Sequence, residues 1–230
     1  MEIKILQLVE GAKAARGITV VIDVFRAFSL EAYMFSMGAK KIIPIGSVDE
    51  AYRLKRENPD YVLAGERHGK ILEGFDTGNA PSLLHLLDLK GKTVVHTTSA
   101  GTQGIANAKD ADEILGCSLV NAKATAEYIR KSGAETVSLV CMGLEALAPT
   151  EEDTLCAEYI KALLEDTDID MKSGIDSLRY TSGAKFFDKA QNDVFPEADF
   201  PMCTDLDRFN FVMRLEVGED GIGYMRRIEV

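Results

Sequence analysis

Short apolar runs rich in β-branched residues alternate with longer stretches of helical periodicity along most of this chain. Strand-like runs at 19–23, 41–45 and 61–64 flank helix-like stretches at 28–37 and 48–57. The first run is almost continuously apolar, so we expect a strand that is buried on both faces and central in its sheet. This order of elements predicts the α/β class, with helices layered on a parallel or mixed sheet in an α/β/α arrangement.

A second series of segments repeats the first. Gly17–Asp23 resembles Gly91–Thr97, and Tyr61–Gly65 resembles Leu139–Gly143, with each pair at equivalent points of the alternation. We interpret the similarity as a weak internal duplication, with a ligand site between two related βαβ halves. Chance similarity between two βαβ units is the alternative.

We expect residues 1–230 to form one compact α/β unit, in which the related halves occupy about 1–88 and 89–165. The remainder, 166–230, departs from the alternation and forms a C-terminal extension. It is expected to end in a β-hairpin, because its last two runs alternate in strand fashion around a glycine-containing turn. The hairpin strands are expected at Phe209–Glu216 and Gly223–Glu229.

Composition limits the class of partner. A net charge of −11 disfavours nucleic acid, whose binding needs a basic surface. No apolar run approaches the roughly 20 residues that span a bilayer, and the chain opens on a strand-like alternation rather than a basic and apolar leader. We therefore expect a cytoplasmic protein with neither membrane nor nucleic-acid partners, and by default a homodimer. The four scattered cysteines are expected to be buried free thiols.

Polar clusters follow four of the strand-like runs, at the sheet edge where open α/β sheets bind ligands. In the first cluster, Asp23 ends the central run three residues before Arg26. Such a carboxylate can hold a divalent metal while the guanidinium binds an anionic oxygen. An ion pair that merely ties the strand to the following helix is an equal alternative.

The second cluster is the glycine-rich loop 65–81, whose charges no packing requirement explains. Glycines at this density let the backbone approach a ligand closely. The alternative is a solvated surface loop. The reactive side chains of the loop are Glu66, Arg67, Asp76 and Asn79.

The third cluster is a run of hydroxyl side chains that leads into a helix. Converging hydroxyls and backbone amides at a helix N-terminus suit phosphate or sulfonate oxygens, whereas ordinary capping would explain only one of them. The hydroxyl residues are Thr97, Thr98, Ser99 and Thr102, and Gly101 among them offers a backbone amide.

The fourth cluster, Glu151–Asp153, opens another helix. Acids in a first turn are either partners of the helix dipole or ligands of Mg²⁺, which prefers one or two carboxylates with waters and ligand oxygens. Such an ion would also let an acidic protein bind an anion.

Among the histidines, His68 is either a proton donor or an exposed bystander, while His85 and His96 lie on apolar segments and are expected to be packed.

Six motifs in this order carry a family resemblance. They are Val20–Ala27, Gly65–Gly69, Gly74–Pro81, Thr97–Thr102, Glu152–Ala157 and Asp207–Phe209. Together they resemble the motifs of the 2-phosphosulfolactate phosphatase family, over roughly residues 3–217. The resemblance implies Mg²⁺-dependent hydrolysis of the phosphate monoester of 2-phospho-3-sulfolactate, a step toward coenzyme M. Two alternatives stay open: another small phosphorylated hydroxy acid as the substrate, or a non-catalytic sensor of such an anion.

The clustered carboxylates, arginines and hydroxyls, taken together with the resemblance, give each of these residues an expected role. Asp23 with Glu152 or Asp153 would hold Mg²⁺. Glu66 or Asp76 would position water or protonate the leaving group. The anionic groups of the substrate would be bound by Arg26, Arg67, Asn79, Thr97, Thr98, Ser99, Gly101 and Thr102.

Overall fold

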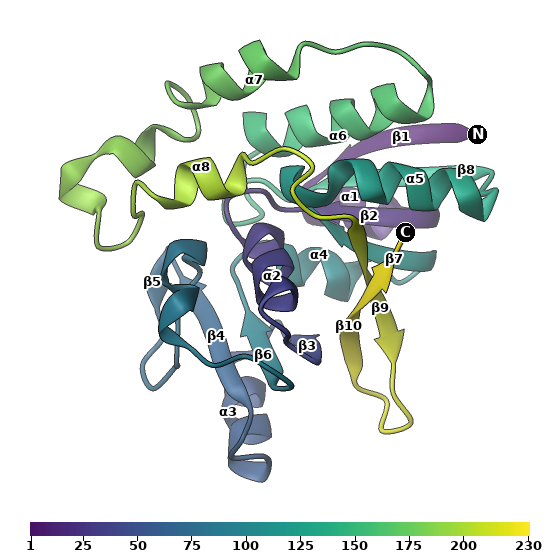
Figure 1. Ribbon diagram of the computed structural model, residues 1–230. Helices are drawn as coiled ribbons and strands as arrows, with labels where there is room; N and C mark the ends of the chain where they lie inside the picture. The colour runs from purple at the N-terminus through teal and green to yellow at the C-terminus, as the bar shows by residue number, and fades with distance from the viewer.

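The computed structural model describes all 230 residues, which form one mixed ten-stranded sheet with helices on both of its faces (Figure 1). The predicted α/β class with layered helices is confirmed. The strands are β1 (Glu2–Gln7), β2 (Gly17–Ile22), β3 (Lys41–Pro44), β4 (Val62–Arg67), β5 (Lys70–Ile71), β6 (Thr93–Thr97), β7 (Ala111–Cys117), β8 (Thr136–Cys141), β9 (Phe211–Val217) and β10 (Gly223–Glu229). The α-helices are α1 (Leu8–Ala14), α2 (Ala27–Ser36), α3 (Val48–Glu57), α4 (Gly101–Asn107), α5 (Ala122–Ser132), α6 (Glu151–Leu164), α7 (Met171–Leu178) and α8 (Asp199–Cys203). Short 3₁₀ helices are η1 (Pro81–Leu86), η2 (Leu119–Asn121), η3 (Ala184–Phe187) and η4 (Lys189–Gln191).

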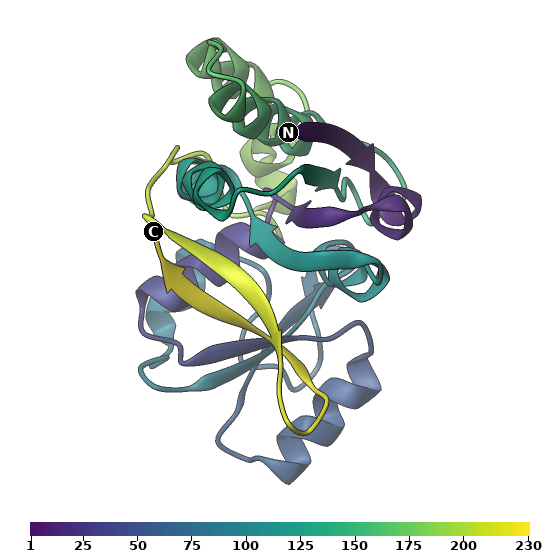
Figure 2. The ribbon, with the colours of Figure 1, turned by 90° about the vertical axis from the view of Figure 1, so that its right-hand side faces the viewer.

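Two parallel groups of strands make up the sheet. β1, β8, β2 and β7 run parallel to one another, and so do β3, β6 and β4. The β9–β10 hairpin joins the groups through antiparallel pairings with β7 and β3, as Figure 2 shows for the yellow hairpin. β5 adds a short antiparallel strand at the edge beside β4.

β2 lies inside the sheet, third in the strand order, and is buried as its composition predicts: Val20, Val21 and Ile22 have no exposed surface. Val20 and Ile22 belong to a core of 23 buried residues that includes side chains of α5 and α6. Val21 belongs to a core of 22 buried residues that includes side chains of α2 and α4. Because successive side chains of a strand point to opposite faces, β2 contributes to both cores.

The two repeats exchange their first strands. β2, from the first repeat, lies between β7 and β8 of the second, and β6, from the second repeat, lies between β3 and β4 of the first. Equivalent strands therefore follow the same order when the sheet is read inward from its two ends: β8-β2-β7 from one end and β4-β6-β3 from the other. This symmetry agrees with an internal duplication. However, residues 1–88 and 89–165 interlock and do not form separate lobes, because each strand group combines strands from both ranges.

Helix α3 shows how local sequence sets the ends of an element. The Ser47 hydroxyl accepts a hydrogen bond from the Glu50 N–H at 3.4 Å, and acids in the first turn and bases in the last turn complement the helix dipole. The apolar side chains Ala51 and Leu54 face inward and belong to a third core of six buried residues. The helix forms because capping, dipole and apolar spacing all favour it.

The C-terminal extension contains α7, η3, η4 and α8 before the predicted hairpin, which forms as β9 and β10. Phe186 and Phe200 of the extension are buried in the 23-residue core. Asp199 of α8 accepts a hydrogen bond from the Ser82 N–H at 2.9 Å, which ties the extension to η1. None of the helices has the length and apolar character needed to cross a bilayer.

Candidate active site

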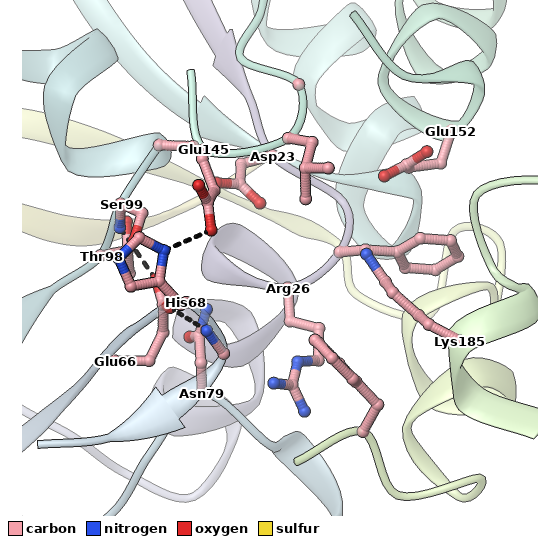
Figure 3. Close-up of a pocket in the computed structure, with 16 residues that line it drawn as sticks. Asp23, Arg26, Glu66, His68, Asn79, Thr98, Ser99, Glu145, Glu152 and Lys185 are labelled. Atoms are coloured by element: carbon pink, nitrogen blue, oxygen red, sulfur yellow. Dashed lines mark hydrogen bonds and ion pairs between the residues drawn. The ribbon is translucent and has the colours of Figure 1, made fainter. Parts of the chain in front are cut away.

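A cavity lies where the carboxyl ends of β2, β4, β6 and β8 meet, with about 110 Å³ open to water-sized molecules. Figure 3 shows side chains from both strand groups and from the C-terminal extension around it. The predicted site residues that line the cavity are Asp23, Arg26, Glu66, Asn79, Thr98, Ser99 and Glu152. These seven side chains therefore meet at the sheet edge where the sequence placed them.

Asp23 directly follows β2 and is only 6% exposed. Its Oδ1 accepts a hydrogen bond from the Ala27 N–H at 3.1 Å, which fixes the carboxylate at the start of α2. The pKa of Asp23 is raised to about 6, chiefly by burial and also by the negative charges of Glu66 and Glu152. A carboxylate in this position gains strongly from a nearby cation.

Gly101 allows Asp23 and α4 to approach each other. A β-carbon at position 101 would lie 2.9 Å from the Ala27 β-carbon and 3.0 Å from Asp23 Oδ2. Any larger residue would therefore push against the carboxylate. Gly101 does not line the cavity, and the absence of a side chain there leaves room for the Asp23 carboxylate.

Glu66 braces two loops through its carboxylate. Its Oε1 accepts a hydrogen bond from the Ser99 N–H at 2.8 Å, and its Oε2 accepts one from the Gly69 N–H at 2.6 Å. These bonds connect the end of β4 to the turn before α4. The Glu66 carboxylate therefore shapes the cavity wall and adds negative charge to it.

Glu152 and Asp153 are neighbours in the first turn of α6, but they have different surroundings. Asp153 accepts hydrogen bonds from the Val24 and Gly143 N–H groups, both at 2.8 Å, and does not line the cavity. Glu152 does line it, and its Oε2 is buried without a hydrogen-bond partner. Burial raises the pKa of Glu152, while the positive charge of Lys185 lowers it. Asp153 therefore uses both carboxylate oxygens on backbone N–H groups, whereas Glu152 lines the cavity and keeps one oxygen without a partner.

Arg26 is held by the C-terminal extension. Its Nη1 donates to Asp199 Oδ2 at 2.6 Å, and the two side chains are 3% and 0% exposed. The guanidinium carbon lies 5.0 Å from the centre of the Phe195 ring, which also lines the cavity. The Nε and Nη2 donors make no hydrogen bond within the protein, so they are available to an anion. The ion pair that the sequence suggested between Asp23 and Arg26 is replaced by one with Asp199.

Arg67 and Asp76 lie outside the cavity lining, which differs from their predicted roles. Arg67 donates to the Glu66 carbonyl at 2.7 Å, the Gly46 carbonyl at 3.1 Å and Thr97 Oγ1 at 2.9 Å. Asp76 Oδ2 accepts the Leu63 N–H at 2.8 Å. Both side chains hold the glycine-rich loop against the sheet, because a loop that leaves a strand needs partners for its backbone groups.

The hydroxyl cluster divides into two parts. Thr98 and Thr102 bond mainly to each other: the Thr102 N–H donates to Thr98 Oγ1 at 3.3 Å, and the Thr102 hydroxyl donates to the Thr98 carbonyl at 3.0 Å. Thr98 therefore accepts one first-turn N–H of α4, although Ala100, the N-cap residue, makes no side-chain cap. Ser99 lines the cavity, and its Oγ is buried without a partner. Its hydroxyl therefore makes no hydrogen bond within the protein.

Lys185 is a cavity residue that the sequence did not indicate. It lies in η3, and its Nζ is 5.3 Å from the centre of the Phe195 ring. No spacing rule connects position 185 with the strand ends, and its only sequence signal is a single base beside two phenylalanines. Lys185 supplies the second fixed positive charge of the cavity.

His68 and Glu145 meet at the cavity wall. His68 Nδ1 lies 2.7 Å from Glu145 Oε1, and the His68 side chain is 79% exposed. Both residues have left-handed backbone conformations, with φ of 53°. Glu145 follows β8 and His68 follows β4, so this contact connects the equivalent loops of the two repeats.

The cavity chemistry suits a divalent cation that is shared with an anionic ligand. Carboxylates of Asp23, Glu66, Glu145 and Glu152 line it, against the fixed cations of Arg26 and Lys185. The structure contains no group of three or more His, Cys, Asp and Glu side chains arranged to hold a metal by themselves. Mg²⁺ commonly uses one or two carboxylates and completes its octahedron with water and substrate oxygens. The buried, unpartnered Glu152 Oε2 and the high pKa of Asp23 fit that requirement.

Comparison with known proteins gives a consistent family. The family model described as 2-phosphosulpholactate phosphatase matches residues 3–218. A Bacillus subtilis (strain 168) protein named "Probable 2-phosphosulfolactate phosphatase" is 33% identical over 223 residues, which is 96% of each chain. A Caldicellulosiruptor saccharolyticus protein of the same name is 45% identical over 144 residues, or 61% of this chain and 59% of its own. A Caldanaerobacter subterraneus subsp. tengcongensis protein, also of that name, is 33% identical over 214 residues, or 86% of this chain and 88% of its own.

The α/β fold, the anion-suited cavity at its carboxyl edge and these relatives define a phosphoric monoester hydrolase. The chain belongs to the 2-phosphosulfolactate phosphatase family. The resemblance carried by the sequence motifs is thereby confirmed.

Proposed function

We propose that this protein is a Mg²⁺-dependent phosphatase that hydrolyses 2-phospho-3-sulfolactate to sulfolactate and phosphate. The main support is that one cavity brings the buried carboxylates of Asp23 and Glu152 together with the cations of Arg26 and Lys185. The substrate is taken from the name of the relatives. A substrate with a phosphate, a sulfonate and a carboxylate needs several separate positive charges, and this cavity can provide them.

In the proposed mechanism each residue has a defined part. Asp23 and Glu152 would hold Mg²⁺, which when bound supplies positive charge to the phosphoryl oxygens. The free donors of Arg26 would bind the phosphate, and Lys185 would bind the sulfonate or carboxylate. The Ser99 hydroxyl would donate to a further oxygen. Overall, a water oxygen joins the phosphorus, the ester bond breaks and the leaving alkoxide takes up a proton.

The proposal predicts that phosphate release from 2-phosphosulfolactate depends on Mg²⁺. Because a bound divalent ion commonly contributes several kcal/mol to stabilising transition-state charge, we expect EDTA to slow turnover by at least about a hundredfold. Added Mg²⁺ should restore the rate. The measurement is colorimetric phosphate release from dialysed protein, with Mg²⁺ and substrate alone as the blank.

Turnover that EDTA does not change would remove the metal from the proposal. Absence of turnover with 2-phosphosulfolactate would remove the substrate. A panel of other small phosphorylated hydroxy acids would then separate a different phosphatase from a sensor, which would bind one of these compounds without hydrolysing it.

Lys185→Gln is expected to raise KM about tenfold while kcat changes by less than about threefold. The lost contact to a charged group of the substrate weakens binding equally in the ground state and in the transition state. Steady-state kinetics measure both constants. Lys189→Gln is the matched control, because Lys189 is an exposed lysine of the neighbouring η4. An unchanged KM in Lys185→Gln would contradict the assigned role.

The same proposal gives the cellular setting. We propose that the protein acts in the cytoplasm, where its product sulfolactate would be available for coenzyme M synthesis. We also propose a homodimer, the commonest closed assembly of soluble oligomers.

A further inference from the structure

We propose that Glu31 and His96 act as positioning residues that orient the Asn79 side chain with its NH₂ group toward the cavity. His96 Nε2 lies 3.2 Å from Asn79 Oδ1, and His96 Nδ1 lies 2.8 Å from Glu31 Oε1. Glu31, His96 and Asn79 thus form a hydrogen-bonded series. Of the three residues, Asn79 lines the cavity, as Figure 3 shows. The inference rests on the proposed function, because it assigns the NH₂ group to an oxygen of the anionic substrate.

Packing alone does not explain the Glu31–His96 pair. Both side chains have no exposed surface. Removing two ionisable groups from water is costly, and apolar residues of similar size would often be as stable or more stable in such a place. Glu31 Oε2 is also buried without a hydrogen-bond partner, which adds to the cost. A buried polar series that costs stability and ends at the wall of a ligand cavity is best explained by its effect on the residue in that wall, Asn79.

The positions of these three residues in the fold explain how the hydrogen-bonded series reaches the cavity. Glu31 lies on α2, which follows Asp23, and His96 lies on β6, which leads to the hydroxyl cluster. Asn79 precedes η1 at the end of the glycine-rich loop. The hydrogen-bonded series therefore connects three of the segments that form the site. Its last member, Asn79, is only 6% exposed.

The orientation follows from hydrogen-bond chemistry. With a proton on Nε2, His96 donates to Asn79 Oδ1, while Nδ1 shares the hydrogen bond with the Glu31 carboxyl group. The Asn79 oxygen is then occupied, and its two N–H donors remain for the cavity. Phosphate and sulfonate oxygens accept hydrogen bonds, so this orientation attracts them. If Nε2 had no proton, the amide would rotate to donate to it and would present its oxygen to the anion.

Histidine NMR on the wild-type protein tests the orientation without any ligand. The chain has three histidines, so long-range ¹H–¹⁵N spectra of ¹⁵N-histidine protein are simple, and His96→Gln identifies the signals of His96. We expect a proton on Nε2 of His96 that exchanges slowly with water. An unprotonated Nε2 would overturn the proposal.

A double-mutant cycle tests the effect on the ligand. Glu31→Gln and His96→Gln are each expected to weaken binding of inorganic phosphate about tenfold, a typical loss for a hydrogen bond to a charged group. In an Asn79→Ala background the same substitutions should change the affinity less than about twofold, because their effect acts through Asn79. His85→Gln is the matched control and should bind phosphate as the wild type does, because His85 is exposed in the structure and not packed as its apolar segment suggested.

Titration calorimetry with inorganic phosphate keeps this proposal separate from the proposed function. Equal losses in the wild-type and Asn79→Ala backgrounds, or no loss in either, would overturn the positioning role. Phosphate binding with the expected non-additivity, but no turnover of 2-phosphosulfolactate, would support the positioning role and reject the proposed reaction.

Discussion

Replacing Asp23 with asparagine is expected to lower kcat/KM by about a thousandfold or more while leaving the protein folded. The loss follows because Asp23 is a buried cavity carboxylate held between the start of α2 and the start of α4, and asparagine carries no charge to hold Mg²⁺. The fold should persist because the amide oxygen can still accept the Ala27 N–H. Phosphate release at saturating Mg²⁺ measures the loss.

The same substitution should make the metal-free protein more stable. The folded-state pKa of Asp23 is raised from its ordinary value of 3.8 to about 6. The unfolded chain therefore ionises at lower pH than the folded protein, and stability falls as pH rises from about 4 to about 6. Asparagine removes this loss, so Asp23→Asn should be more stable by up to about 3 kcal/mol above pH 6, and no more stable than the wild type below pH 4.

Urea unfolding in EDTA at several pH values measures this gain. Asp60→Asn is the matched control, because Asp60 is an exposed aspartate outside the cavity. It should leave both turnover and the pH dependence of stability unchanged. Wild-type turnover in Asp23→Asn would show that Asp23 is not an essential carboxylate of the active site. A stability difference that grows toward low pH would show that ionisation of Asp23 does not destabilise the folded protein.

Periodicity predicted most of the strands and longer helices of the fold, but it did not indicate α1 or α8, nor how the strands pair. The apolar run of β2 predicted a central strand, and its side chains do reach the cores on both faces. The similarity of the two repeats could not show that β2 pairs with β7 and β8 of the other repeat. Strand exchange leaves the local pattern unchanged, since each strand meets an equivalent apolar environment on either side. Only the long-range hydrogen bonds distinguish the two arrangements.

For the site, the sequence predicted the location better than the individual roles. Asp23, Glu66 and Glu152 were predicted at one sheet edge, and they meet there. Charge alone could not show that Asp153 and Asp76 use their oxygens on backbone N–H groups. Loops that leave a sheet must satisfy such groups, and an acid that does so looks the same in sequence as one that binds a metal.

The cations were the least predictable part of the site. Arg67 stands in the most distinctive motif, yet it bonds to carbonyls of the loop and of Gly46. Lys185 comes from a segment without a recognisable motif and reaches the cavity only because the C-terminal extension folds back over it. Long flexible cations are placed by tertiary packing, and sequence spacing holds little information about that.

Arg26→Met is expected to be the most destabilising single change in the site. It leaves the fully buried Asp199 carboxylate without its guanidinium partner, and removing one member of a buried ion pair typically costs about 3 to 5 kcal/mol. It also removes the donors assigned to the phosphate, so turnover should fall by at least about a hundredfold. Urea unfolding and steady-state kinetics measure the two losses separately.

A second substitution separates the structural part of Arg26 from its part in binding. In Arg26→Met/Asp199→Asn the uncompensated charge is gone, and the amide oxygen introduced at position 199 can still accept the Ser82 N–H, so most of the stability should return. Activity should stay low, because nothing replaces the guanidinium in the cavity. Arg130→Met is the matched control: Arg130 and Asp166 form an exposed pair, and its loss should cost less than about 1 kcal/mol. Recovery of turnover together with stability in the double variant would mean that Arg26 serves only to balance Asp199, and the phosphate would then have to be bound by the remaining cavity donors.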